Sequence, residues 1–292
     1  MSSTSLHIVI AGAGPAAQAL VRRLAGKGGP RPQGHRTFDG TITVLSNRDE
    51  CSDELLELAE LPKVSIRFGQ AASFIDAAAK VVTTVDGMDF AYDQLVIATG
   101  SAPALPPVTG AYCGLNYSTI DDAGPIGEAV KDVTRVVGRR PLGILVGTGP
   151  AAGQAEAVLR ARGVRPVRTT LRPTAVVPSL AGSALPATGI LFEDGSSMNG
   201  DLVVLAEERT ARTELAESAG LAIAHDGGIA VGRDLATSVP GIWAIGDAAS
   251  CDGLRLGLLL SAESSAMLCA SGLLSASRAG VFSPAEQAPA AA

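Results

Sequence analysis

Short runs of apolar residues alternate along this chain with segments of helical pattern. The run Leu6–Ala11 predicts a strand, and Gln18–Ala25 after it predicts a helix. Glu54–Leu61 predicts a short helix that ends at Pro62, because proline cannot continue a helix. Further strands are predicted over Thr41–Leu45, Val64–Phe68, Ser73–Ile75, Lys80–Val85, Asp89–Tyr92 and Gln94–Gly100.

The same pattern starts again in the middle of the chain. The strand Gly143–Val146 leads into a second glycine-rich turn and a helix that extends to Arg162. Both turns read Gly-x-Gly-Pro-Ala-Ala, and the second begins 135 positions after the first. This internal repeat predicts two lobes of similar construction. Later predictions are strands over Arg165–Leu171, Leu202–Ala206 and Ile242–Ile245, loop-like sequence over Pro173–Thr188, and a closing helix over Leu259–Ser275.

Composition is consistent with buried cores and excludes one class of partner. Hydrophobic residues make up 47% of the 292 residues and charged residues 18%, which suits one large or two modest domains. The formal net charge is -6, and lysine and arginine form no stripe. Because nucleic-acid binding needs clustered basic residues to neutralise phosphates, no nucleic-acid partner is expected.

No targeting or membrane segment is predicted. The first strand begins at Leu6, which leaves no room for a signal peptide, and the most apolar stretch, Leu254–Leu274, is interrupted by Arg255 and Glu263. The cysteines stand at positions 51, 113, 251 and 269 and form no Cys-x-x-Cys pair, so neither a zinc ribbon nor a thioredoxin-like redox pair is expected. Free thiols favour a cytoplasmic location.

Each glycine-rich turn is a candidate seat for a pyrophosphate group. In such a strand–turn–helix, the first glycine permits the tight turn, the second lets the backbone approach the phosphates, and a small third residue packs helix on strand. One match alone can reflect tight packing, but two in this context indicate dinucleotide binding. The first candidate is Gly12, Gly14 and Ala17, with Pro15 and Ala16 between them; the second is Gly147, Gly149 and Ala152.

A third segment carries a resemblance to a known family. Thr237–Asp247 ends an apolar strand with Gly246-Asp247. Here the sequence resembles the FAD-dependent pyridine nucleotide-disulfide reductases, which include the nitrite reductase flavin domain, ferredoxin reductases and thioredoxin reductase. The resemblance implies that Asp247 bonds the ribityl chain of FAD. A second match, the crossover segment Tyr92–Pro103, implies that the cofactor also lies near Ala98, Thr99 and Gly100.

The chain departs from the family after its second strand. The family has a carboxylate there for the adenosine ribose, whereas Asn47 stands nearest that place, with Asp49 and Glu50 just beyond. A neutral amide should bond the hydroxyls less strongly. The family's Arg/Lys-containing loop near the pyrophosphate is not recognisable in Cys51–Leu61. Cys51 lies where some members carry a redox cysteine, but its spacing and the lack of a second cysteine favour an ordinary thiol.

The middle of the chain is shorter than in the family. The glutamate that family members place beside the nicotinamide falls near Gln154, with Glu156 two residues on. Arg168 and Arg172 are candidates for binding a 2′-phosphate, which favours NADPH over NADH. The alternative is that both arginines are solvated charges.

These patterns and the resemblance together predict an α/β protein with two Rossmann-like lobes, doubly wound and three-layered. The FAD lobe is expected over residues 1–110 and 211–292, with a shortened NAD(P)-binding-like lobe, residues 111–210, inserted in it. The expected reaction passes electrons from NAD(P)H through FAD to a small-molecule or protein acceptor. Two alternatives stay open. One is a flavin-binding accessory subunit with a degenerate nucleotide lobe and a partner subunit, and the other is a flavin-dependent oxidase or tailoring enzyme reduced by its own substrate. No catalytic residue and no metal site is predicted.

Overall fold

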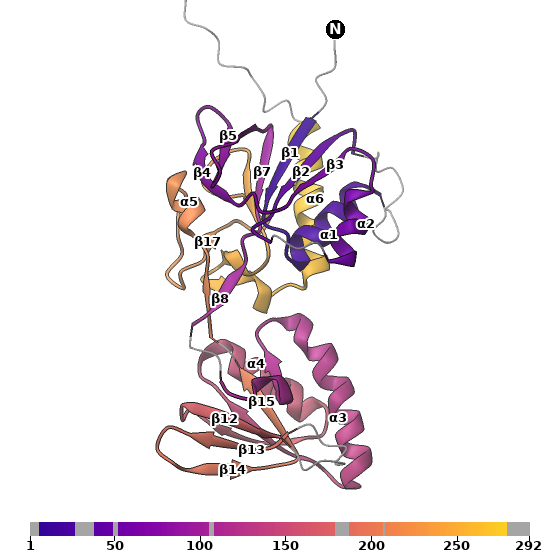
Figure 1. Ribbon diagram of the computed structural model, residues 1–292, viewed down its shortest axis with the longest axis vertical. Helices are drawn as coiled ribbons and strands as arrows, with labels where there is room; N and C mark the ends of the chain where they lie inside the picture. Colours follow the sequence, from indigo (N-terminus) through magenta and orange to yellow (C-terminus); the bar gives the residue numbers. More distant parts are fainter. Residues whose placement is uncertain are drawn as a thin grey trace, which may run out of the picture. The chain divides into compact units, whose positions relative to one another are not determined.

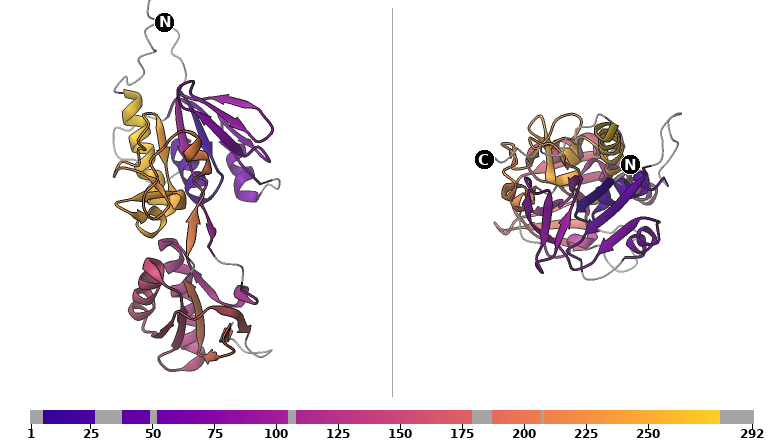
Figure 2. Two further views of the ribbon diagram at one scale, coloured as in Figure 1. Left: turned by 90° about the vertical axis from the view of Figure 1, so that its left-hand side faces the viewer. Right: turned by 90° about the horizontal axis from the view of Figure 1, so that it is seen from above.

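The chain forms two compact units. A computed structural model describes residues 6–26, 38–48, 52–104, 108–178, 187–206 and 208–278. Unit 1 combines residues 1–100, 213–253 and 262–292, and unit 2 combines residues 101–212 and 254–261. The helices and strands of each unit can be followed in Figures 1 and 2.

Unit 1 is built on a five-stranded parallel sheet in the order β18-β7-β1-β2-β3. Its central strands β1 and β7 are mostly apolar and mostly buried, as expected for a parallel sheet covered on both faces. The strand order reverses between β1 and β7, which makes the sheet doubly wound. The strands are β1 (Leu6–Ala11), β2 (Gly40–Leu45), β3 (Val64–Arg67), β7 (Gln94–Ile97) and β18 (Ile242–Ala244).

Helices and a small antiparallel sheet complete unit 1. Helix α1 (Pro15–Leu24) follows β1 and packs against both α2 (Asp53–Ala59) and the last helix, α6 (Ala262–Arg278). In Figure 1, α1 and α6 run side by side next to the parallel strands. The other elements of this unit are β4 (Ala72–Asp76), β5 (Val81–Thr84), β6 (Asp89–Ala91), α5 (Glu214–Ser218), β17 (Ile229–Ala230), η3 (Gly246–Ala248) and β19 (Ala249–Cys251).

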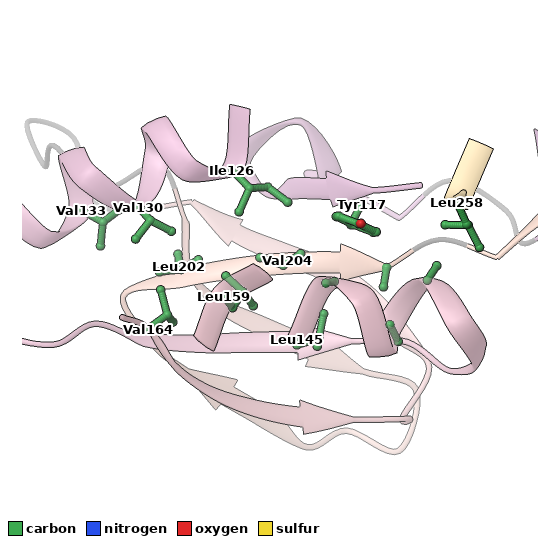
Figure 3. Close-up of a cluster of buried hydrophobic side chains, with 14 residues drawn as sticks. Tyr117, Ile126, Val130, Val133, Leu145, Leu159, Val164, Leu202, Val204 and Leu258 are labelled. Carbon is green, nitrogen blue, oxygen red and sulfur yellow. The ribbon is translucent and has the colours of Figure 1, made fainter. Parts of the chain in front are cut away.

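Unit 2 repeats this plan with a four-stranded parallel sheet in the order β11-β10-β15-β9. Figure 3 shows side chains of α3 and α4 meeting the sheet in one apolar cluster that includes Tyr117, Ile126, Leu145, Leu159 and Val204. The elements are β9 (Leu115–Tyr117), α3 (Ala123–Val137), β10 (Leu142–Val146), α4 (Gly149–Ala161), β11 (Arg165–Thr169) and β15 (Leu202–Ala206).

A second apolar cluster covers the opposite face of this sheet. Val203 and Leu205 of β15 pack with Val176, Ile190 and other side chains of a three-stranded antiparallel sheet. Unit 2 therefore has three layers, as predicted. The remaining elements are β8 (Ser101–Pro103), η1 (Ala111–Cys113), η2 (Ile120–Asp122), β12 (Pro173–Pro178), β13 (Ala187–Phe192), β14 (Ser197–Asn199), β16 (Arg209–Ala211), β20 (Leu254–Arg255) and η4 (Leu256–Leu258).

The predicted α/β class with two parallel-sheet lobes is confirmed, but the prediction of loop over Pro173–Thr188 is wrong at both ends. Strand β12 occupies residues 173–178 and β13 begins at Ala187, while residues 179–186 lie outside the described parts. The strand forms because Val176 is buried against the parallel sheet, although prolines stand at both ends of β12. Helix α3 was not predicted at all.

An ion pair joins the segments that lead into β10 and β15. Arg139 donates to both carboxylate oxygens of Asp201 at 2.8 Å, and the Leu142 N–H donates to the same carboxylate at 2.7 Å. Burial on its own would raise the pKa of Asp201, but these donors outweigh it and hold that pKa below its ordinary value. This carboxylate therefore stabilises unit 2 in its ionised form.

Candidate functional site

The first glycine-rich turn joins β1 to α1 and brings three strand ends together. The Gly12 N–H donates to Leu45 O at 2.8 Å, at the end of β2. Gly12 has a φ of +114°, and a Cβ there would lie 2.2 Å from the carbonyl oxygen of Ala98, after β7. No other residue fits this position, because both the dihedral angle and the close approach exclude a side chain. Ala17, which is 1% exposed, packs the helix onto the sheet.

The second glycine of this turn faces open space. Gly14 is the N-cap of α1 and has an ordinary extended conformation, with φ −75° and ψ −179°. A Cβ on Gly14 would meet no atom within 4 Å. Pro15 occupies the first helical position, where its missing N–H costs nothing. The N-terminus of α1 is thus accessible, and its N–H groups and dipole favour an anion such as a pyrophosphate group.

The Gly246-Asp247 segment lies beside this turn. The Ile245 N–H donates to Ile97 O at 3.0 Å, so β18 ends next to β7. A Cβ on Gly246 would lie 3.0 Å from the Cβ of Ala16 in α1, which shows how closely the segment approaches the helix. Asp247 follows in η3 and is half-buried. The structure therefore brings together Gly12, Gly14, Pro15, Ala16, Ala17, Ala98, Thr99, Gly100, Gly246 and Asp247 at the carboxyl end of the sheet.

Two polar residues follow β2: Asn47, which was predicted as a site residue, and Arg48, which sequence reasoning missed. Asn47, the predicted partner of the adenosine ribose, is exposed just after β2. Arg48 is the next residue, and its N–H donates to the Ser46 hydroxyl at 3.1 Å. Asp49, Glu50 and Cys51 lie outside the described residues. A cavity of about 330 Å³ is lined by Pro15, Gln18, Ala19, Arg22, Arg48, Glu54, Ala262 and Glu263.

Arg48 therefore offers a cation near the first turn. Pro15, at the start of α1, lines the same cavity as Arg48 and Glu54. The family resemblance implies a basic residue in a longer loop, whereas Arg48 stands directly after the strand, before Cys51–Leu61. Its position at a strand's carboxyl end is the signal that could have identified it.

The second glycine-rich turn repeats the backbone contacts of the first at its leading glycine. The Gly147 N–H donates to Thr169 O at 3.1 Å, at the end of β11. Gly147 has a φ of +146°, and a Cβ there would lie 2.5 Å from the carbonyl oxygen of Ala206, at the end of β15. Ala152 is fully buried between α4 and the sheet. Gly147 in unit 2 thus has the same structural role as Gly12 in unit 1.

The two turns differ at their second glycine. A Cβ on Gly149 would lie 3.2 Å from Oε1 of Glu208, a residue just beyond the end of β15. The Thr148 hydroxyl donates to the same carboxylate. Sequence reasoning missed Glu208, although a charged residue after a strand that flanks the glycine turn is a signal for this position.

Arg168 and Arg172 both have acidic partners. Arg168 Nε donates to Gly147 O at 3.2 Å, and its guanidinium lies 3.8 Å from the Glu156 carboxylate. Arg172, which follows β11, lies 3.7 Å from Glu193 and is mostly exposed. Arg168 is therefore held at the glycine turn, whereas Arg172 is a surface charge in a weak ion pair.

Gln154 is part of a hydrogen-bonded chain inside unit 2. The Tyr117 hydroxyl donates to Gln154 Oε1 at 3.1 Å, and Gln154 Nε2 donates to Leu258 O at 3.0 Å. Burial, with a contribution from the Asp122 carboxylate, raises the pKa of Tyr117, so this hydroxyl keeps its proton as a donor. These bonds fix the orientation of the Gln154 amide.

The thiols of the described residues give no sign of redox chemistry. Cys113, Cys251 and Cys269 are free, and the last two are buried. Burial raises the pKa of the Cys269 thiol, which makes it an inert packing residue. Within the described residues, no group of three or more His, Cys, Asp or Glu side chains could hold a metal ion, and no helix is long and apolar enough to cross a membrane.

Sequence comparison identifies the family. The pattern of the pyridine nucleotide-disulphide oxidoreductases matches residues 6–168 and 144–269, which together cover most of the chain. The chain belongs to this family of FAD-dependent NAD(P)H oxidoreductases. The resemblance that Thr237–Asp247 and Tyr92–Pro103 indicated is thereby confirmed.

Individual relatives match either most or part of the chain. The assimilatory nitrate reductase electron transfer subunit of Bacillus subtilis (strain 168) is 30% identical over 67% of this chain and 28% of its own length. The nitric oxide reductase FlRd-NAD(+) reductase of Aeromonas salmonicida (strain A449) is 28% identical over 88% of this chain and 74% of its own length. The chain spans about a quarter of the length of its nitrate and nitrite reductase relatives.

Solved structures share the fold. Putidaredoxin reductase, in its covalent complex with putidaredoxin, superposes with a TM-score of 0.56 at 20% identity. The alignment covers 93% of this chain and 76% of that chain, so the likeness extends over both units.

Proposed function

We propose that this chain is a flavoprotein that binds FAD in unit 1 and passes electrons from NAD(P)H to an acceptor. The observation that carries the proposal is the open face of Gly14 at the N-terminus of α1, where neither the φ angle nor a neighbouring atom requires a glycine. Gly246-Asp247 lies against the same helix. Family membership supports FAD as the dinucleotide.

Each residue group of unit 1 has a distinct part in holding the cofactor. The N–H groups at the start of α1, with Pro15 and Ala16 in its first turn, face the pyrophosphate group. Asp247 accepts a hydrogen bond from a ribityl hydroxyl, and Asn47 bonds the adenosine ribose. Arg48 neutralises part of the phosphate charge. When bound, FAD supplies the hydride and electron chemistry, which the protein's residues position and tune.

Unit 2 is the proposed site for NAD(P)H. Gly147, Gly149 and Ala152 form the pyrophosphate turn, and Gly147 makes the same kind of backbone contacts as Gly12 in the first turn. Arg168 lies within β11 and Arg172 follows it, where a 2′-phosphate would be bound, which favours NADPH. Arg168 is the stronger candidate, because its hydrogen bond to Gly147 O already holds it at the turn.

The proposed acceptor is a protein electron carrier. Two relatives support this class: one is named as an electron transfer subunit and another as a FlRd-NAD(+) reductase. A carrier can take electrons at the surface, so no small-substrate pocket is required.

A second candidate function is that of an accessory flavin subunit. Two observations favour it: the parallel sheet of unit 2 has four strands against five in unit 1, and a carboxylate occupies the face of Gly149. Under this alternative, electrons would reach the flavin from a partner subunit rather than from NAD(P)H.

Absorbance of the purified protein tests the FAD proposal. The protein, incubated with excess FAD and desalted, should show flavin bands in the visible range and release FAD on denaturation. A protein that stays colourless after this treatment would overturn the assignment of unit 1.

A further inference from the structure

The face of the second glycine turn that would receive a pyrophosphate holds a carboxylate. At the first turn, a Cβ on Gly14 would meet nothing within 4 Å. At the second, a Cβ on Gly149 would lie 3.2 Å from Oε1 of Glu208, and the Thr148 hydroxyl donates a hydrogen bond to this carboxylate. The backbones also differ there, because Gly14 is an extended N-cap with a φ of −75°, whereas Gly149 has a φ of +64° and follows the N-cap Thr148. The carboxylate beside Gly149 has no counterpart at Gly14.

The backbone around Glu208 is fixed. Its carbonyl oxygen accepts a hydrogen bond from the Ala104 N–H at 2.9 Å. The next residue, Arg209, pairs with Pro103 in the β16–β8 ladder, and its Nε donates to the Ser101 hydroxyl at 2.7 Å. Because these contacts hold the backbone, rotation of the Glu208 side chain is the direct way for the carboxylate to leave the turn.

Local electrostatics favour the carboxylate where it lies. Thr148 is the N-cap of α4, a helix of 13 residues, and the positive end of a helix dipole attracts an anion. Arg168, which bonds to the turn at Gly147 O, is also paired with Glu156. A phosphate arriving at this place would thus meet a negative charge with little free positive charge to offset it.

We propose that Glu208 competes internally with dinucleotide phosphates and sets the affinity of unit 2 for NAD(P)H. The inference rests on the proposed use of this turn for NAD(P)H. For a nucleotide to bind, the Glu208 side chain must give up its hydrogen bond with Thr148 and rotate out of the turn. The affinity is lowered by the free energy of that rearrangement and by the remaining repulsion.

Calorimetric titration of the FAD-loaded protein with NADP⁺ and NAD⁺ tests the proposal without any redox reaction. Glu208→Gln keeps a side chain of the same shape but removes the charge, and Glu208→Gly empties the face of Gly149. The Glu208→Gly variant should bind both nucleotides about ten-fold more tightly than the natural chain, and Glu208→Gln should fall between the two. The gain in Glu208→Gln should shrink as salt is raised, because screening weakens the repulsion in the natural chain.

Glu128→Gln is the matched control. It removes one negative charge from an exposed residue of α3, where Glu128 pairs with Lys131 at 2.8 Å, and it should leave both dissociation constants unchanged. Thermal unfolding of all variants shows whether they are folded. A Glu208→Gln variant that gains no more than Glu128→Gln would overturn the role of the Glu208 charge.

The outcomes separate this inference from the proposed function. If the natural chain binds nucleotide and the Glu208 variants bind it more tightly, both stand. If only the variants bind, Glu208 acts as proposed and NAD(P)H use by the natural chain is refuted. Equal binding by all proteins overturns the inference alone, and an absence of binding in all of them overturns both.

Discussion

Alanine at each glycine of the first turn should separate folding from cofactor binding. The structure gives Gly12 and Gly14 opposite surroundings, although only one residue lies between them. Gly12 is enclosed by backbone, whereas Gly14 faces open space. We therefore expect Gly12→Ala to reduce stability and Gly14→Ala to reduce FAD affinity.

Gly14→Ala should fold normally. Its φ of −75° is ordinary for alanine, and the added methyl group meets no atom within 4 Å. Only the poorer N-cap propensity of alanine lowers the free energy of unfolding, by at most about 1 kcal/mol. When FAD binds, however, the methyl group stands where the pyrophosphate approaches. Loss of one hydrogen bond to a charged group costs about 1.5–3 kcal/mol, which raises the FAD dissociation constant roughly 10- to 100-fold.

Gly12→Ala should be unstable even without cofactor. Its Cβ would lie 2.2 Å from Ala98 O, a backbone atom that cannot move without disturbing β7, and its φ of +114° disfavours any L side chain. The left-handed conformation costs about 1–2 kcal/mol and the overpacking a further 1–3 kcal/mol. The free energy of unfolding should fall by about 3 kcal/mol.

Urea unfolding of the apoprotein and fluorescence titration with FAD measure the two effects. A stable Gly14→Ala protein that binds FAD as tightly as the natural chain would refute the reasoning, because the open face would then not be the cofactor's. Equal instability of the two variants would refute the described geometry of the turn.

Three further variants test separate parts of the account. Asp247→Ala should weaken FAD binding roughly 10- to 100-fold through loss of its bond to the ribityl chain, and an unchanged dissociation constant would remove that role. Joint replacement of Arg168 and Arg172 by alanine should raise the dissociation constant for NADP⁺ several-fold and leave that for NAD⁺ nearly unchanged, whereas equal effects on both would argue against a 2′-phosphate site. Asp201→Asn should lower the free energy of unfolding by about 1–3 kcal/mol at pH 7, since it leaves Arg139 without its carboxylate. Because the pKa of Asp201 is lowered on folding, its contribution is present above about pH 4 and is lost as the pH falls further; the two proteins should then converge in acid, and a difference that persists there would contradict this assignment.

The strands and glycine turns were predictable because their signals are local. Leu6–Ala11 and Leu202–Ala206 are continuous apolar runs, and the structure has strands with these bounds. A Gly-x-Gly turn after such a run leaves the chain few conformations. Family membership could be predicted for the same reason, because its signal lies in one contiguous segment, Thr237–Asp247. The family pattern confirms this prediction.

Elements that depend on distant contacts were harder to predict. Strand β12 reads as loop because prolines stand at its ends, and it forms by pairing with β13 across residues 179–186. Helix α3 was missed because Gly124, Pro125 and Gly127 interrupt its first turns, although Ile126, Val130 and Val133 follow helical spacing and are buried.

Two charged residues of the candidate sites were missed for a related reason. Arg48 and Glu208 belong to no motif, and each stands just beyond the carboxyl end of a parallel strand. Their relation to the glycine turns appears only when neighbouring strand ends are brought together. In a doubly wound sheet, every charged residue at such a position should be considered beside the glycine motif.

Anaerobic absorbance titration of the FAD-loaded protein with NADPH and NADH tests the central claim most directly. The account predicts that NADPH bleaches the visible flavin bands without any partner protein, and that NADH does so more slowly. If dithionite bleaches the flavin while neither nucleotide does, the claim that this chain takes electrons from NAD(P)H is contradicted.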